Sequence, residues 1–170
     1  MNVPDPDAHS VAAFRRFYQL LPRDADQALL ILKLHLLVEE QVRAYVDERL
    51  QNAKSLEAAR LDCHAAICLA EALCGDDIHP RVWEAARKLN ELRNQVAHKL
   101  EPAGIQKRVD TICELIGLNL KAMAAVDGPF PPEAMDNFIF AVAMLHGEVS
   151  LFVKRKPASV VHLVPPSSVA

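Results

Sequence analysis

The chain has 170 residues and a formal net charge of −3, with 51% hydrophobic residues, 24% charged residues and only 5 glycines. This composition is typical of one globular domain and excludes extensive disorder, and aromatic residues at 5% favour helices over a β-sandwich or barrel. No apolar run of about 18 residues is present to span a membrane, and the acidic, proline-broken residues 1–7 are unlike a signal peptide. We therefore expect a cytoplasmic, all-α protein.

The first two helices are predicted over residues 8–21 and 25–52. Pro22 ends the first, and Asp24 is a suitable N-cap for the second, whose run contains no Gly or Pro. Positions three and four apart mark one face of the second helix, which we expect to be buried. This face consists of Leu29, Leu32, Leu36, Glu39, Arg43, Val46 and Leu50. Glu39 is therefore predicted to lie on the inner side of the helix.

Four more helices are expected in the rest of the chain. The third begins at the N-cap Ser55 and ends at Gly75. The fourth begins at Pro80, and we expect Trp83 to anchor it in the core or at a subunit interface. The fifth covers residues 105–126 and the sixth residues 133–153. The sequence thus predicts an up-and-down bundle of about five to six helices over residues 1–153, followed by a Pro-, Ser- and Val-rich tail over residues 154–170.

The four cysteines contain no CxxC pair, and the composition is not that of a small disulfide-linked domain. Cys63, His64 and Cys68 lie close in sequence, but a structural zinc site needs four ligands at recognisable spacing, and no second pair follows. We therefore expect the cysteines to be small buried side chains, and we expect no metal or cofactor.

Arg93, Asn94 and His98 stand near the predicted end of the fourth helix. They lie within residues 81–121, which carry 8 Lys and Arg against 5 Asp and Glu, a net of +3 in an otherwise acidic chain. Asn94 and His98 are one turn apart and share a helix face, whereas Arg93 and His98 are five residues apart and diverge. A site that uses both residues is expected to be completed by another helix or by a second copy of the chain.

The segment Arg93-Asn94-Gln95-Val96-Ala97-His98 resembles the motif of the HEPN superfamily, in which Arg is followed after a short spacing by His. The long early helix with Glu39 on its inner face is similar to the acidic helix that packs beside the motif in that family. The resemblance covers residues 8–153 in the order and length of the helices. It implies a metal-independent endoribonuclease, active as a homodimer whose two motifs face each other, and acting as a toxin or anti-phage defence effector.

The residues suit this chemistry, because RNA supplies its own nucleophile, the ribose 2′-hydroxyl. His98 can exchange a proton near neutral pH, and Arg93 can bind the scissile phosphate through a permanent planar charge. Asn94 would orient His98 or donate to a phosphate oxygen, and Glu39 would hold Arg93 in place. The expected products are a 2′,3′-cyclic phosphate and a 5′-hydroxyl end.

Other interpretations of the same residues stay open. Glu39 could instead form an ion pair with Arg43 or Arg93, and His98 could bind the last carbonyls of its helix. The protein would then be a non-catalytic helical dimer that binds and regulates a partner protein. His35, one turn before Glu39, is expected to be a packed or surface histidine.

Two further features bear on function. Leu100 stands where some two-gene toxin systems of the family have a Tyr, so inactivation by modification of that Tyr is not expected here. An antitoxin or regulator would have to be a separate protein. A DNA-binding repressor is disfavoured, because no helix-turn-helix signal with basic recognition residues is found.

Overall fold

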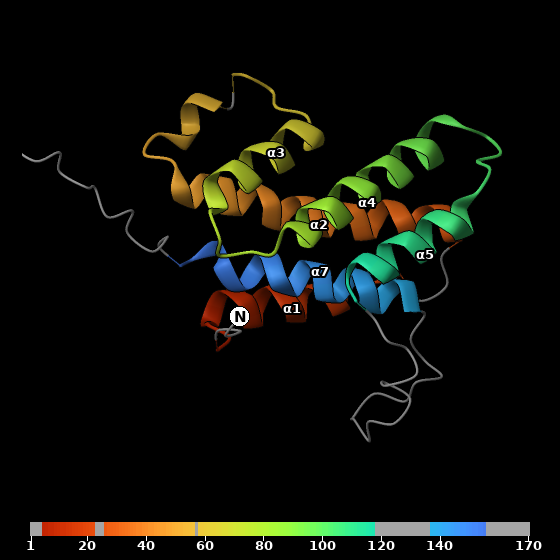
Figure 1. The fold of residues 1–170 in the computed structure, drawn as a ribbon, viewed down its shortest axis with the longest axis horizontal. Coiled ribbons are helices and arrows are strands. Elements are labelled where there is room, and N and C mark those ends of the chain that lie inside the picture. Colours follow the sequence, from red (N-terminus) through yellow and green to blue (C-terminus); the bar gives the residue numbers. More distant parts are fainter. Residues whose placement is uncertain (1–4, 23–25, 57, 118–136, 156–170) are drawn as a thin grey trace, which may run out of the picture.

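The computed structural model describes residues 5–22, 26–56, 58–117 and 137–155, which form helices and loops without a strand (Figure 1). This confirms the prediction of an all-α bundle. The helices are α1 (Ala8–Leu20), α2 (Gln27–Arg49), the short 3-10 helix η1 (Ala53–Leu56), α3 (Cys63–Cys74), α4 (Pro80–His98), α5 (Ile105–Leu115) and α7 (Asn137–Val153). None of the described helices is both long enough and apolar enough to cross a membrane.

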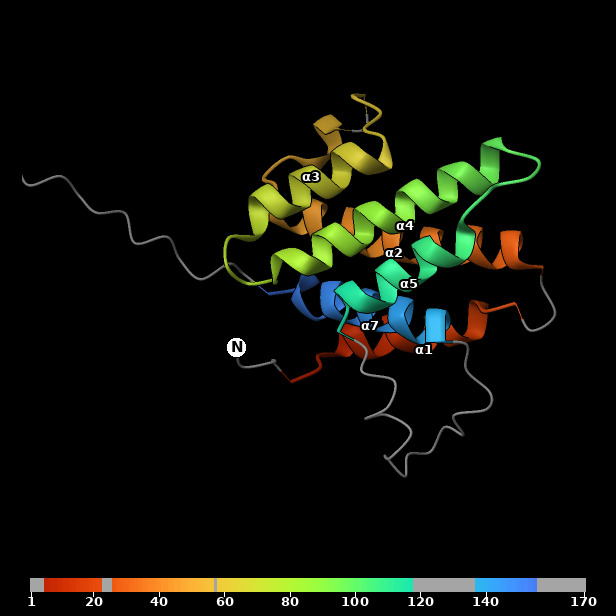
Figure 2. The same ribbon diagram turned by 45° about the vertical axis from the view of Figure 1, so that its right-hand side comes forward.

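Helices α2 and α7 form the centre of the bundle and pack against each other (Figures 1 and 2). Helix α1 packs against α7, while α3 and α4 pack against each other and against α2. Helix α5 contacts both α4 and α7 and so joins the two sides of the bundle. Helices α3 and α4 therefore lie on the side of the bundle away from α1 (Figure 1).

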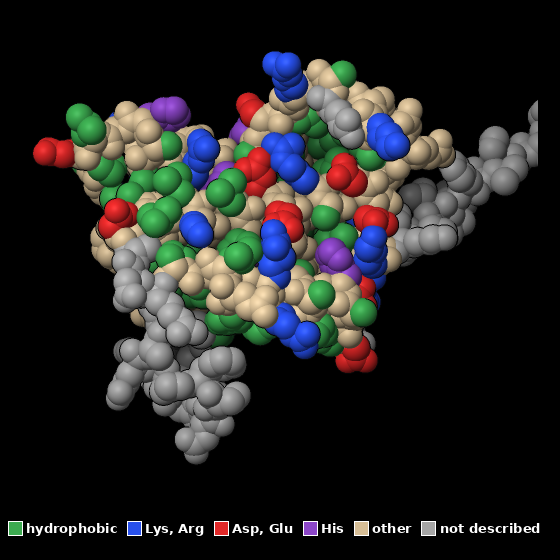
Figure 3. Space-filling view, turned by 180° about the vertical axis from the view of Figure 1, so that it is seen from behind, with side chains coloured by type: hydrophobic (Ala, Val, Ile, Leu, Met, Phe, Trp, Pro, Cys, Tyr) green, Lys and Arg blue, Asp and Glu red, His purple; other side chains and the backbone are tan. Residues whose placement is uncertain are grey.

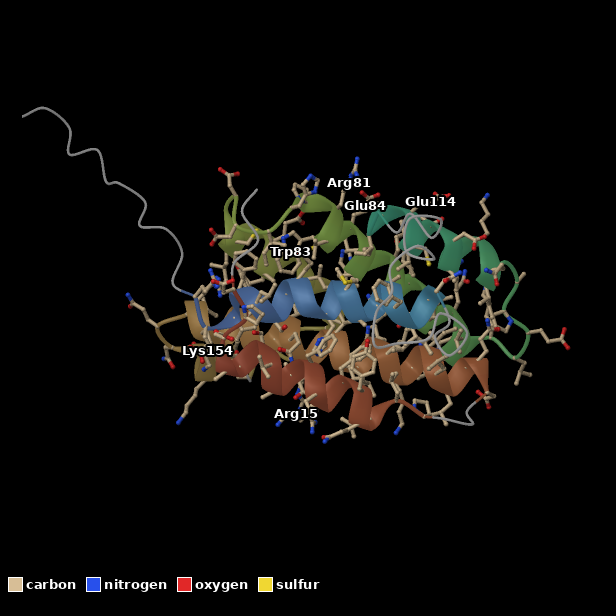
Figure 4. All side chains as sticks on the ribbon, turned by 90° about the horizontal axis from the view of Figure 1, so that it is seen from below. Arg15, Arg81, Trp83, Glu84, Glu114 and Lys154 are labelled. Carbon is tan, nitrogen blue, oxygen red and sulfur yellow. The ribbon has the colours of Figure 1, made fainter. Side chains whose placement is uncertain are left out.

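Trp83 occupies the core beneath α4. Its side chain is fully buried, its ring meets the Tyr45 ring edge-on at 5.6 Å, and its Nε1 donates a hydrogen bond to Cys74 Sγ at 3.2 Å. Figure 4 shows Trp83 directed into the bundle, whereas Arg81 and Glu84 of the same helix lie at its outer edge. The prediction that Trp83 anchors the fourth helix is confirmed, and the anchor lies in the core of this chain.

Aspartate side chains start three of the helices. Asp7, Asp26 and Asp62 each accept a hydrogen bond from the backbone N–H three residues later, at 2.7–2.8 Å. The predicted N-cap Asp24 lies outside the described residues. The prediction that Ser55 begins the third helix is wrong, because Ser55 belongs to η1 and α3 starts only after Asp62. An ionised carboxylate is a stronger acceptor for the exposed N–H groups of a first turn than a hydroxyl is.

The buried face of α2 is rotated from the predicted one. Leu29 and Leu36 are 43% and 58% exposed, although the sequence placed them on the buried face. The core residues of α2 are Ile31, Leu34, Leu37, Val38, Val42, Tyr45 and Val46, and among these Val46 alone was on the predicted face. Because α7 contacts α2 on one side and α3 and α4 contact it on another, the buried face is broad. The predicted stripe lies along one border of this face.

The later helices differ from the prediction at their ends. Helix α5 ends at Leu115, followed by Gly117 at a φ of +73°, whereas the sequence predicted a helix to residue 126. A left-handed glycine of this kind commonly ends a helix. Residues 118–126, the predicted start of the sixth helix at residue 133 and the tail from residue 156 lie outside the described residues. Within the described part, the sixth predicted helix corresponds to α7.

Arg49 connects the end of α2 to the end of α7 through hydrogen bonds. Its guanidinium lies 3.3 Å from the centroid of the Tyr45 ring and donates hydrogen bonds to the backbone oxygens of Phe152, Val153 and Arg155 at 2.9–3.4 Å. Phe152 and Val153 belong to the last turn of α7 and Arg155 follows it, so these carbonyls lack the usual helical acceptor role four residues on, and a cation is favourable at a helix C-terminus. Arg49 therefore holds together the two central helices.

Candidate functional site

The motif residues lie on the last two turns of α4. Arg93 is half-buried, and its Nη1 donates a hydrogen bond to Asn94 Oδ1 at 2.9 Å. Asn94 is exposed, and His98 is the exposed last residue of the helix. Leu89 and Leu92 of the same helix are fully buried in the core and hold this end of α4 against the bundle. The arrangement leaves polar groups of the motif open to a ligand.

A cleft of about 310 Å³ lies where α2, the start of α3 and the end of α4 meet. It brings together three of the four predicted site residues, Glu39, Arg93 and Asn94. His98 is not among the described residues that line it. The divergence of Arg93 and His98 expected from their spacing is therefore visible in the fold.

Glu39 forms its shortest contacts with Arg43, one of the two partners that the sequence allowed. Arg43 Nη2 and Nε lie 2.6 and 2.9 Å from Glu39 Oε1, and Nη2 also donates to the Leu61 backbone oxygen at 3.0 Å. The Glu39 side chain is 18% exposed, so it lies on the inner side of α2 as predicted but reaches the cleft. Arg43 thus fixes one oxygen of the carboxylate and ties α2 to the loop before α3.

His35 is a buried histidine at the floor of the same cleft. Its Nε2 lies 3.0 Å from Asn90 Oδ1, and its Nδ1 lies 3.7 Å from Glu39 Oε2. Burial lowers the pKa of His35, although the Glu39 carboxylate and the Asn90 hydrogen bond oppose this effect. A packed or surface position was expected for His35 from the sequence, and it is packed. The spacing of His35 and Glu39, one helical turn apart, is the signal that could have placed it at the site.

Cys63 faces this cleft from the first residue of α3. It is half-buried, and burial together with the nearby Glu39 carboxylate raises the pKa of its thiol to about 12. The expectation of buried cysteines holds for Cys74 and Cys113 but not for Cys63 or the exposed Cys68. All four cysteines are within the described residues, and none forms a disulfide.

The cleft combines two guanidinium groups, Arg43 and Arg93, with the carboxylates of Glu39 and Asp62. Arg43 is engaged by Glu39, while the Arg93 guanidinium has donors beyond the one used by Asn94. A phosphate group could therefore be bound by Arg93 at the open side of the cleft. Comparisons with protein-family models, curated proteins and solved structures each gave no match, so function is inferred from the site itself.

Proposed function

We propose that this protein is a metal-independent endoribonuclease of the HEPN type that acts as a homodimer. The observation that carries the proposal is the position of the motif in an all-α bundle. Arg93 and Asn94 line a polar cleft beside the inward Glu39, and His98 is exposed at the end of the same helix. The substrate is RNA, and the products are a 2′,3′-cyclic phosphate and a 5′-hydroxyl end.

The residues divide the reaction between charge stabilisation and proton transfer. Arg93 binds the scissile phosphate and stabilises the charge that builds up on its oxygens as the 2′-hydroxyl attacks. His98 exchanges a proton with the reacting oxygens, which a histidine does efficiently near neutral pH. Asn94 holds Arg93 through its side-chain oxygen and leaves its amide group for the phosphate. Glu39 contributes to the shape and charge of the cleft, with Arg43 as its direct partner.

A second copy of the chain completes the site. Five residues along an α-helix correspond to a rotation of about 140° and a rise of about 7.5 Å, so one chain presents Arg93 and His98 in different directions. In a two-fold dimer, His98 of the second copy would reach the phosphate held by Arg93 of the first. Each proposed active site therefore contains Arg93 of one chain and His98 of the other.

The exposed leucines of α2 provide a contact surface for this dimer. Leu29 and Leu36 are two turns apart on one face of α2, and Glu39 continues that face into the cleft. Figure 3 shows hydrophobic side chains gathered over the part of this side of the molecule where α2 begins, with charged side chains spread over the rest. Burial of such leucines against a second copy stabilises a dimer through the hydrophobic effect.

The proposed biological role is that of a toxin or anti-phage defence effector. Unrestrained RNA cleavage harms the cell that contains it, so activity has to be held back by an antitoxin or regulatory protein. Leu100, which is fully exposed two residues after His98, takes the place of the Tyr that is modified in some related systems. The restraint is therefore proposed to come from binding by a separate protein.

RNA cleavage in the presence of EDTA tests the proposal. Wild-type protein is expected to cleave and to leave cyclic phosphate ends, and His98→Ala and Arg93→Ala are each expected to lower the rate by about 10²–10⁴-fold. His64→Ala is the matched control, because His64 also lines the cleft but has no role in the proposed reaction. Equal rates for His98→Ala and wild type would contradict the proposal.

Mixing two inactive variants tests the composite site. After subunit exchange, half of the dimers contain one Arg93→Ala chain and one His98→Ala chain, and each such dimer keeps one complete site. Recovery of about a quarter of the wild-type rate is expected from this two-fold arrangement. Leu36→Glu should give a monomer without activity, whereas Val11→Glu on α1, another exposed apolar position, should leave the dimer intact. No recovery on mixing would show that each chain acts alone.

The second candidate function is that of a protein-binding regulator, favoured by an apolar groove between α1 and α7. The groove has a volume of about 360 Å³ and includes Val11, Phe14, Met144 and Leu151, of which the first three are 41–48% exposed. A folded dimer that cleaves none of a varied set of RNAs in EDTA would favour this function over the nuclease.

A further inference from the structure

Three side chains of different chemistry converge in the cleft. One ligand atom each from His35, Glu39 and Cys63 can be chosen so that all lie within 4.8 Å of one another. His35 and Glu39 come from successive turns of α2, and Cys63 comes from the first turn of α3. In the sequence, the metal-binding residue types close to Cys63 are its neighbours His64 and Cys68. The fold brings it instead to residues that are 24 and 28 positions away.

Asn90 determines which nitrogen of His35 is available. The Asn90 Oδ1 atom accepts the hydrogen bond of Nε2–H at 3.0 Å, so in the neutral ring the lone pair is on Nδ1. Nδ1 has no hydrogen-bond partner in the part of the chain that the structure describes, although the side chain is only 3% exposed. A buried imidazole nitrogen without a partner is unfavourable, unless a cation completes the site. A second-sphere hydrogen bond of this kind is the usual way in which a metal-binding histidine is oriented.

Arg43 orients the Glu39 carboxylate in a similar way. Its Nε and Nη2 both donate to Oε1, which leaves Oε2 directed at His35 Nδ1 at 3.7 Å. This separation is too long for a hydrogen bond, and it places two lone pairs opposite each other. The ligands of a tetrahedral zinc ion lie roughly 3.3–3.8 Å apart, given bond lengths of about 2.0–2.3 Å. The spacing between these two atoms therefore matches a shared metal ion.

We infer that His35 Nδ1, Glu39 Oε2 and Cys63 Sγ form a site for a zinc-like divalent cation, with water as the fourth ligand. Cys63 would lose its proton to solvent on binding, and a rotation of its side chain would bring Sγ closer to the other two atoms. Thiolate and imidazole ligands select Zn²⁺ over Mg²⁺ or Ca²⁺. The two negative ligands neutralise the ion, and the Asp62 carboxylate at the cleft partly offsets the charges of Arg43 and Arg93.

Cobalt(II) is the probe for the test, because a cobalt–thiolate bond gives a charge-transfer absorption band in the near ultraviolet. Full-length protein kept reduced with a non-thiol reductant is titrated with Co²⁺ and then with Zn²⁺. We expect one Co²⁺ to bind per chain and the absorption band to have the intensity of a single cobalt–thiolate bond. Addition of Zn²⁺ should abolish the band. Cys63→Ser should abolish the band, and Glu39→Gln should weaken binding by at least about tenfold.

Cys68→Ser is the matched control. Cys68 is exposed on the same helix and its Sγ lies 3.7 Å from His64 Nε2, so this pair is the competing source of a thiolate bond. The inference predicts an unchanged band in Cys68→Ser. A wild-type protein without the band, or a band lost in Cys68→Ser and kept in a folded Cys63→Ser, would overturn it. Metal binding is measured without RNA, and RNA cleavage is measured in EDTA, which removes metal ions. The metal site and the proposed nuclease activity are therefore tested independently.

Discussion

His146 makes the stability of this protein depend on pH in a calculable way. Its ring lies 5.0 Å from the ring of Phe17, between α7 and α1, and the side chain is only 1% exposed. Its Nδ1 has no hydrogen-bond partner within the described residues. Burial, with a smaller contribution from His9, lowers the pKa of His146 to about 4. The folded protein therefore keeps this imidazole neutral under mildly acidic conditions.

The unfolded chain exposes the same imidazole with a pKa of about 6.5. Above about pH 7.5 the ring is neutral in both states and adds no pH dependence. As the pH falls from 6.5 towards 4, the unfolded state binds a proton that the folded state does not, so the free energy of unfolding falls. With these two pKa values, the loss between pH 7.5 and pH 5.0 is about 2 kcal/mol. This is a large part of the stability of a typical domain.

Urea unfolding of wild type and His146→Leu at pH 7.5 and pH 5.0 checks this magnitude. Trp83, the only tryptophan and fully buried, reports unfolding through its fluorescence. His146→Leu keeps an apolar side chain against Phe17 and removes the titration, so its loss of stability should be smaller than that of wild type by about 2 kcal/mol. The burial-lowered pKa of His35 contributes equally to both proteins and cancels. Equal losses in the two proteins would contradict the lowered pKa of the buried His146.

Three further changes test contacts in the fold by thermal or urea unfolding. Asp62→Ala removes the N-cap of α3 and should cost about 1 kcal/mol, and an unchanged stability would mean that the cap is dispensable. Asn90→Ala leaves the buried Nε2–H of His35 without its acceptor and should cost about 1–3 kcal/mol, and an unchanged stability would contradict this role of Asn90. Arg49→Met keeps packing on Tyr45 but loses the carbonyl contacts, and should cost about 1–3 kcal/mol, which a neutral result would contradict.

The candidate site was predictable from the sequence only in part. Arg93, Asn94 and His98 are close in the chain and lie on one helix, so their spacing shows that Arg93 and His98 diverge. The convergence of His35, Glu39 and Cys63 depends on how α2 meets α3, which no local pattern encodes. The partner of Glu39 was likewise open in the sequence, and the packing of Arg43 against the loop before α3 decided it.

Several helix boundaries follow from the local preferences of single residues, although the start of α3 and the end of α5 do not. Pro80 at the start of α4 and Gly75 after α3 act through their own backbone preferences, which do not depend on the rest of the fold. The rotation of α2 about its axis depends on packing with other helices, because Leu29 and Leu36 match the helical period as well as the residues that are buried. Helix α2 packs against neighbours on two sides, and this packing selects its buried face from several of similar hydrophobicity. The resulting rotation places His35 in the cleft and leaves Leu29 and Leu36 exposed.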